Sequence, residues 1–217
     1  MATEMMCPTL QVSTTSSTTT TSTTTNFPSE FNVNLVKNGD GETGSCETSN
    51  GIKRPTSWNY NGEVTQVAYN NPKHGPMSLS SPGPRNRGNC YFFGQISSST
   101  TMWQTIYLNN TVAAVLIDSL TVNFRLSAWI GGWEDQNDNA KISLTFLNQF
   151  SQQVGYVTNI GPVSASDRNY ISMMLYREAG GVVPIGARVA KVLVTFTRTA
   201  QKSNDGSVDN IALVLHQ

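Results

Sequence analysis

From Phe31 to the C-terminus, short apolar runs alternate with turn-rich stretches, and within each run the apolar residues recur at every second position. One run spaces its apolar side chains in this way at Val122, Phe124, Leu126, Ala128 and Ile130. Because successive side chains of a strand point to opposite faces, this spacing predicts strands with one buried and one exposed face.

The pattern predicts about ten strands, over residues 32–36, 64–69, 90–96, 102–108, 122–130, 142–146, 153–158, 171–177, 192–197 and 211–215. Turn-forming pairs such as Asn38-Gly39, Gly131-Gly132 and Gly180-Gly181 are expected to separate them. The only stretch with helical potential is Val112–Ile117, which would form one or two turns. Strands of this kind are stable when two antiparallel sheets pack face to face, so the fold class is all-β and the architecture is an antiparallel β-sandwich.

The N-terminal region has a different composition. Every residue from Ser13 to Thr25 is Ser or Thr, so this tract has no apolar side chain to bury and cannot offset the entropy lost on ordering. We therefore predict that residues 1–30 form a disordered Ser/Thr-rich tail or linker and that residues 31–217 form one domain.

Charge and hydropathy restrict the partners. Fourteen basic residues balance fourteen acidic ones, so nothing in the sequence indicates a nucleic-acid partner. No apolar run reaches the roughly 18 residues of a membrane span. Charged residues are only 13% of the chain, and a surface made mostly of Ser, Thr, Asn and Gln is typical of extracellular β-proteins. We therefore expect an extracellular or cell-surface location, although no secretory signal is visible at the N-terminus.

The predicted domain contains two cysteines, Cys46 and Cys90. If they pair, the disulfide closes a loop of about 45 residues and contributes about 3–4 kcal/mol of stability by the loop-entropy relation. The alternative is that both are unpaired small side chains, and the sequence does not choose between the two.

Three stretches together resemble a known family. They are 34–44 with 55–58 (Asn-Leu-Val-Lys-Asn-Gly-Asp-Gly-Glu-Thr-Gly, then Pro-Thr-Ser-Trp), 183–194 (beginning Val-Pro-Ile-Gly-Ala-Arg) and 204–213 (Asn-Asp-Gly-Ser-Val-Asp-Asn-Ile-Ala-Leu). In this order they are similar to motifs of jelly-roll carbohydrate-binding modules of the galactose-binding-domain-like superfamily. The resemblance implies a jelly-roll sandwich whose first and last strands are neighbours, and it implies a glycan or polysaccharide as partner.

The resemblance also implies a structural calcium ion, held by Glu42 and Asp209 with Asp40 and Asp205 as further candidate ligands. Calcium prefers six to eight oxygen ligands, which carboxylates and backbone carbonyls together can supply. The alternative is that these acids are ordinary turn residues, because Asp-Gly and Asn-Gly sequences favour turns without any metal.

Sugar binding needs flat apolar faces for C–H surfaces and planar hydrogen-bonding groups for hydroxyls. Trp129 is out of phase with the apolar face of its strand, so it is expected on the opposite, exposed face. Trp133 follows a Gly-Gly pair and has polar neighbours that include Asp135 and Asn137. We predict that these four residues bind the ligand, together with a second polar group at Arg87 and Tyr91; the alternatives are packing under loops and an ordinary solvated loop. A remaining tryptophan, Trp58, is expected in the core.

Little in the sequence favours catalysis. The chain has two histidines, His74 in a turn-rich loop and His216 next to the C-terminus, and it lacks the common nucleophile and phosphate-loop motifs. The leading hypothesis is a non-catalytic carbohydrate-binding or adhesive, lectin-like extracellular module, which we expect to form part of a larger multidomain protein. The alternatives are a protein-interaction or structural cell-surface domain without sugar specificity, and a fragment of a carbohydrate-active enzyme.

Overall fold

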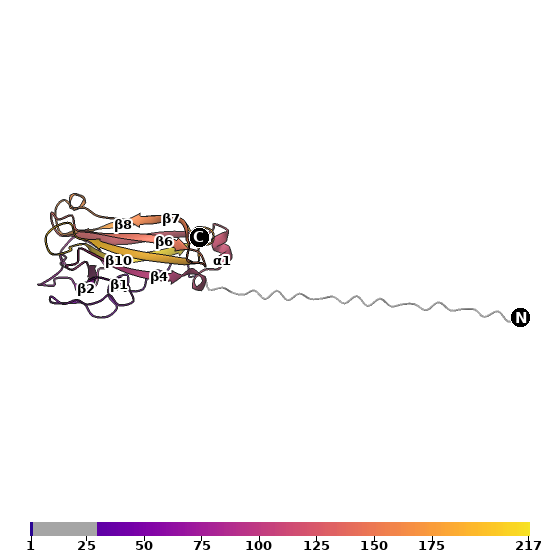
Figure 1. The fold of residues 1–217 in the computed structure, drawn as a ribbon, viewed down its shortest axis with the longest axis horizontal. Helices are drawn as coiled ribbons and strands as arrows, with labels where there is room; N and C mark the ends of the chain where they lie inside the picture. Colours follow the sequence, from indigo (N-terminus) through magenta and orange to yellow (C-terminus); the bar gives the residue numbers. More distant parts are fainter. Residues whose placement is uncertain (2–29) are drawn as a thin grey trace.

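Ten strands form two five-stranded antiparallel sheets that pack face to face in the computed structural model, which describes Met1 and residues 30–217 (Figure 1). The all-β class, the sandwich and the number of strands predicted from the periodicity are confirmed. Most of the predicted Ser/Thr-rich tail lies outside the described residues.

The two sheets are named here sheet I and sheet II. Sheet I consists, in spatial order, of β1 (Asn59–Asn61), β4 (Ser99–Tyr107), β9 (Val189–Thr197), β6 (Asn139–Leu147) and β7 (Gln153–Ile160). Sheet II consists of β2 (Thr65–Ala68), β3 (Cys90–Phe93), β10 (Ser207–His216), β5 (Asn123–Gly132) and β8 (Met173–Val182). The helical elements are short: η1 (Leu108–Asn110), α1 (Ala114–Asp118) and η2 (Ser166–Arg168). Within the described part of the chain, no helix has the length and apolar character needed to cross a membrane.

The main core lies between the two sheets and is filled by every second residue of the strands. Leu126, Ala128 and Ile130 of β5 are fully buried there, as the alternation predicts. Trp58 is also a core residue, 5% exposed, and its indole N–H donates to the backbone carbonyl of Asn38 at 3.1 Å. Removal of this apolar surface from water is the main force that holds the sheets together.

A second, smaller apolar cluster lies on the outer face of sheet II. Its buried members are Val67, Tyr69, Met77, Tyr91, Phe93 and Met174, and Trp129 packs against them. The segment 70–89, which joins β2 to β3, covers this part of the sheet: it contributes Met77, and its Pro82 carbonyl accepts a hydrogen bond from the Met174 amide at 2.9 Å. One end of this outer face is therefore covered, and the edge of the covering segment borders the site described below.

The first and last segments of the domain are neighbours, as the family resemblance implies. β3 pairs with β10 only at Ser207 and Val208, and the segment 32–39 runs alongside the rest of β10. The amide of Ile211 donates to the carbonyl of Gly39 at 2.8 Å, and a Cβ at Gly39 would collide with the carbonyl oxygen of Ile211. This close approach explains why glycine follows Asn38.

The strands depart from the prediction most clearly near the N-terminal side of the domain and at the Gly-Gly pairs. Residues 32–36 make only an isolated bridge between Asn34 and Val214 instead of a strand, and β1 was not predicted. Gly131-Gly132 and Gly180-Gly181 lie inside β5 and β8 rather than between strands. At Gly131 the reason is space, because a Cβ there would collide with the backbone of Met173 on β8.

Candidate functional site

A groove of about 380 Å³ lies on the outer face of sheet II, at the edge of the covering segment. One wall is aromatic: Trp129 of β5 and Tyr176 of β8 are directly paired across the two strands, with ring centroids 5.8 Å apart and planes inclined by 58°. Trp129 is half-buried and lies on the outer face, as its phase predicts. The hydroxyl of Tyr176 donates to a carboxylate oxygen of Glu178 at 2.8 Å, which fixes its orientation.

The remaining walls of the groove are rich in amide and carboxyl groups, supplied by Asn34, Asn38, Asp40, Asn86 and Asn210. The side-chain amide of Asn210 donates to that of Asn86 at 3.2 Å, so two groups from distant parts of the chain are held side by side. A flat aromatic wall and planar hydrogen-bonding groups are thus brought to one surface.

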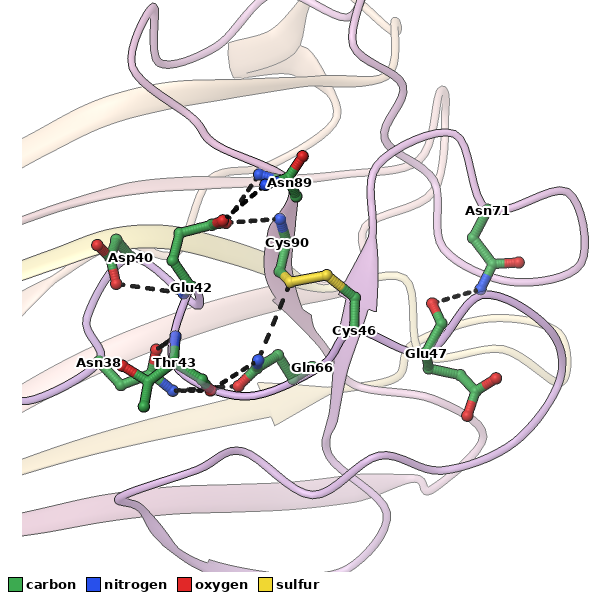
Figure 2. Close-up of a disulfide and its surroundings, with 10 residues drawn as sticks. All are labelled: Asn38, Asp40, Glu42, Thr43, Cys46, Glu47, Gln66, Asn71, Asn89 and Cys90. Atoms are coloured by element: carbon green, nitrogen blue, oxygen red, sulfur yellow. Dashed lines mark hydrogen bonds between the residues drawn. A yellow bond between two sulfur atoms is a disulfide. The ribbon is translucent and has the colours of Figure 1, made fainter.

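Asn38 fixes the loop that places Asp40 in the wall of the groove. It has a left-handed backbone conformation, with φ of 50°. Its side-chain amide donates to the Thr56 carbonyl at 2.8 Å. Figure 2 shows its other contacts: the amide also donates to the Gln66 side chain at 3.1 Å, and the side-chain oxygen accepts from the Thr43 amide at 2.8 Å. The Asn-Gly motif is therefore a turn whose first residue joins three separate segments.

Cys46 and Cys90 form a disulfide, which decides between the two alternatives that the sequence left open (Figure 2). Their Cα atoms are 5.7 Å apart, and 44 positions of sequence separate them. The bond links the loop after Asn38 to the first residue of β3.

Glu42 joins the same loop to the start of β3 by hydrogen bonds. One oxygen of its carboxylate accepts from the backbone amides of Asn89 and Cys90, at 2.8 and 2.7 Å, and the other accepts from the Asn89 side chain at 3.0 Å. In Figure 2 the Glu42 side chain points directly at these donors. Asp40 in turn accepts from the Glu42 amide at 3.3 Å.

Asp209 lies in β10, opposite Trp129 in register, and is fully buried. One carboxylate oxygen accepts from the Tyr69 hydroxyl at 2.7 Å and the other from the Asn210 amide at 2.7 Å. Burial raises the pKa of Asp209 to about 7; the negative charges of Glu42 and Asp40 also raise it, while its two hydrogen bonds lower it. A buried carboxyl without a cationic partner is easier to protonate because desolvation disfavours the charge.

The four acids named as candidate calcium ligands do not meet at one point. Asp205 lies apart from the other three, beside Asp138, whose side chain accepts from the Asp205 amide at 3.1 Å. Both oxygens of Glu42 and of Asp209 already accept hydrogen bonds. Over the described residues, no three His, Cys, Asp or Glu side chains come together in a way that could hold a metal ion. The calcium ion implied by the resemblance therefore stays a prediction that the donor geometry does not support.

Arg87 and Tyr91 belong to the covering segment and the cluster beneath it. The Arg87 guanidinium donates to the carbonyls of Pro84, Ser78 and Ser81, at 2.9, 3.0 and 2.7 Å. Tyr91 is completely buried, and its hydroxyl accepts from the Met77 amide at 3.2 Å. The second cluster encloses the ring of Tyr91, so the ring does not lie on the surface or in the groove.

Trp133, Asp135 and Asn137 lie in the loop between β5 and β6 and do not line the Trp129 groove. Trp133 is 37% exposed and borders a different pocket. Asp135 is exposed, and the side-chain oxygen of Asn137 accepts from the Ala165 amide at 3.0 Å. The two tryptophans proposed as ligand contacts thus lie on separate surfaces.

Sequence reasoning missed Tyr176 and Asn210 as groove residues. Tyr176 lies in a predicted strand, but its position opposite Trp129 follows from the register of β5 with β8, which the sequence does not reveal. Asn210 adopts a left-handed conformation, with φ of 50°, where the pairing of β10 with β5 shifts. An Asp-Asn pair inside an apolar strand pattern was the available signal for such an irregularity.

No family model and no curated protein matches the sequence. Among solved structures, the enzymatically active domain of tailspike protein 4 from bacteriophage CBA120 is similar over 84% of this chain and 21% of that one, with TM-score 0.52 and 18% identity. The arabinose-bound α-L-arabinofuranosidase MgGH51 is similar over 85% of this chain and 27% of that one, with TM-score 0.50 and 9% identity. The chain thus spans about a quarter or less of these two proteins.

Carbohydrate-binding modules are also among the structural neighbours. TmCBM61, solved with β-1,4-galactotriose, is similar over 85% of this chain and 99% of that one, with TM-score 0.47 and 14% identity. At sequence identities this low, structural similarity is evidence about the fold alone. The comparisons therefore bear on the β-sandwich fold, and membership of a carbohydrate-binding family stays a prediction.

Proposed function

We propose that this domain is a non-catalytic carbohydrate-binding module that binds a glycan or polysaccharide in the Trp129 groove. The observation that carries the proposal is the aromatic pair Trp129–Tyr176 facing the amide groups of Asn86 and Asn210 across one groove. Aromatic faces bury the C–H surfaces of a sugar ring, and planar amides hydrogen-bond to its hydroxyls.

The charges of the groove favour a neutral ligand. Its lining residues include the carboxylate of Asp40 but no Lys or Arg. An acidic polysaccharide would bring its own negative charge next to Asp40, with no cation in the lining to balance it. Neutral hexose or pentose polymers meet no such repulsion, so they are the class of ligand that the groove fits best.

We further propose that the domain works outside the cell as one part of a longer protein. The Cys46–Cys90 disulfide supports this location, because disulfides form and persist mainly in oxidising compartments. The low fraction of charged residues agrees with it. In the tailspike and arabinofuranosidase chains the matched region is also only a fraction of the whole, 21% and 27%.

The test is binding of the parent domain and of variants to an array of neutral oligosaccharides and polysaccharides, followed by calorimetry on the best ligand. Tyr176→Ala and Asn86→Ala should each weaken binding about tenfold or more, since a buried hydrogen bond or stacking contact is worth about 1–3 kcal/mol. Tyr156→Ala is the matched control, because Tyr156 is 94% exposed on β7 and lines no part of the groove. If Tyr176→Ala and Asn86→Ala bind the ligand as tightly as the parent and Tyr156→Ala do, the groove is not the binding site.

A further inference from the structure

A second pocket, of about 440 Å³, lies at one end of the sandwich, between three loop segments. The segments are 71–76, the beginning of the β5–β6 loop, and the stretch that leads into β10. Its walls combine an aromatic ring, an imidazole, side-chain amides and a carboxyl group, from Trp133, His74, Asn71, Gln136, Gln201 and Asp205. The lining also includes Lys73, whose positive charge is opposite to that of the Asp205 carboxylate. The volume falls in the usual range of small-ligand sites, roughly 300–1,000 Å³.

Arg168 holds the Trp133 side of this pocket in place from below. It is fully buried, and its guanidinium donates to the carbonyl oxygens of Trp133, Gln136, Glu134 and Ile171, at 3.1, 2.8, 3.0 and 2.6 Å. Burial lowers the pKa of Arg168, and no carboxylate in the described part of the chain forms an ion pair with it. Burying a charge in this way is costly. The result is a β5–β6 loop fixed at three carbonyls and tied to the segment before β8 by the fourth.

Asp138 does the same for the opposite side of the pocket. It is fully buried, and its carboxylate accepts from the backbone amides of Ala200 and Asp205, at 3.1 Å each, and from the hydroxyl of Thr199 at 3.0 Å. Two buried residues of opposite charge are therefore used to fix backbone segments rather than to neutralise one another. Sites that bind small ligands gain affinity from such prior ordering, because less freedom is lost on binding.

Buried polar atoms without a hydrogen-bond partner also gather at this end of the molecule. In the described residues there are three: the side-chain oxygens of Gln136 and Asn204, and the Nε of Arg168. All three residues belong to the segments around the pocket or to the anchor beneath it. Unpartnered buried polar groups are rare in folded proteins, and a bound water or a ligand group is the usual partner of such an atom.

We propose that the Trp133 pocket is a second saccharide site, separate from the Trp129 groove, which binds the terminal unit of a neutral glycan chain. The inference rests on the proposed function. Trp133 supplies the apolar face for the sugar ring, and Gln136, Gln201 and Asp205 supply hydrogen-bonding groups to its hydroxyls. Loops bound this pocket at the end of the sandwich, whereas the groove lies along a sheet, so the pocket fits a chain end and the groove fits an internal stretch.

Asp205 adds to this chemistry. Burial and the negative charge of Asp138 raise its pKa to about 6, against the opposing effect of Arg168. The Asp205 carboxyl lines the pocket, where it can hydrogen-bond to a sugar hydroxyl.

The experiment counts sites. Isothermal titration of the parent, Trp129→Ala, Trp133→Ala, Gln201→Ala and the control Tyr156→Ala would use neutral oligosaccharides, β-1,4-galactotriose among them, with thermal melts to confirm folding. Crystals soaked in the same ligand would show where it binds. We expect two sites per chain in the parent, and we expect Trp133→Ala and Gln201→Ala to weaken only one of them at least tenfold.

The outcomes separate the two proposals. Ligand beside Trp129 alone, or a stoichiometry unchanged by both Trp133→Ala and Gln201→Ala, overturns the second site and leaves the proposed function standing. Ligand beside Trp133 alone supports this pocket and overturns the groove. A parent that binds no member of the glycan panel overturns both.

Discussion

Replacing Asp209 with asparagine should stabilise the domain at alkaline pH. The carboxyl group of Asp209 is fully buried between β10 and the covering segment, and its pKa is raised from 3.8 to about 7, chiefly by burial. Asparagine has nearly the same shape and carries no charge at any pH. Its oxygen can accept from the Asn210 amide, while its amide donates to the Tyr69 oxygen and the Tyr69 hydroxyl turns to the Met174 sulfur, which lies 3.9 Å away.

The size of the effect follows from the pKa values. Below pH 3.8 the carboxyl is protonated in both the folded and the unfolded chain, so its ionisation takes nothing from the unfolding free energy. As pH rises towards 7, the unfolded chain ionises while the folded chain must hold the proton, so stability is lost. Above both pKa values the loss reaches up to about 4 kcal/mol, because each pKa unit is worth about 1.4 kcal/mol.

Urea unfolding of the parent and of Asp209→Asn at pH 4, 6 and 8 measures this difference. The variant should gain up to about 4 kcal/mol in unfolding free energy at pH 8, less at pH 6, and close to nothing at pH 4. Asp135→Asn, which changes an exposed loop carboxylate, is the control and should alter stability little at any of the three pH values. A variant less stable than the parent at pH 8, with a parent that melts higher in calcium chloride and lower in a chelator, would refute the reasoning and make Asp209 a calcium ligand.

Two further predictions concern the loop between Asn38 and β3. Replacing both Cys46 and Cys90 with serine should lower the unfolding free energy by about 2–4 kcal/mol, measured in urea, with the parent in reductant behaving like the variant. Glu42→Gln should lower the unfolding free energy by about 1–3 kcal/mol. Glutamine keeps only one oxygen, whereas Glu42 uses two to accept from two backbone amides and the Asn89 side chain. A melting temperature equal to that of the parent would show that the disulfide alone holds the loop.

The fold was accessible from the sequence because its determinants are local. Because apolar residues recur at every second position, the sequence predicts that Leu126 and Ile130 face the core and that Trp129 faces outward. A strand shifted by one position would exchange these two faces. The same reasoning failed at Gly131-Gly132, because a Gly-Gly pair looks the same in the sequence whether it lies in a strand or in a turn. Only the approach of the Met173 backbone distinguishes them.

The site was accessible only in part, since it depends on which strands are neighbours. Trp129 was identified from its phase alone. Tyr176 becomes its partner through the pairing of β5 with β8, and Tyr91 is buried because the segment 70–89 folds over β3. Both facts arise from the packing of residues more than ten positions apart, which a single sequence does not encode in any local pattern.

The groove and the loop beside it also share their rigidity. Asp40 reaches the groove wall from a loop that is fixed on one side by the side chain of Asn38 and on the other by Glu42 and the Cys46–Cys90 disulfide. A sugar that binds beside Asp40 therefore meets a wall that has already lost its freedom during folding, and it does not have to order that wall itself. On this reasoning the disulfide and the Glu42 hydrogen bonds contribute to affinity as well as to stability, although neither touches the ligand.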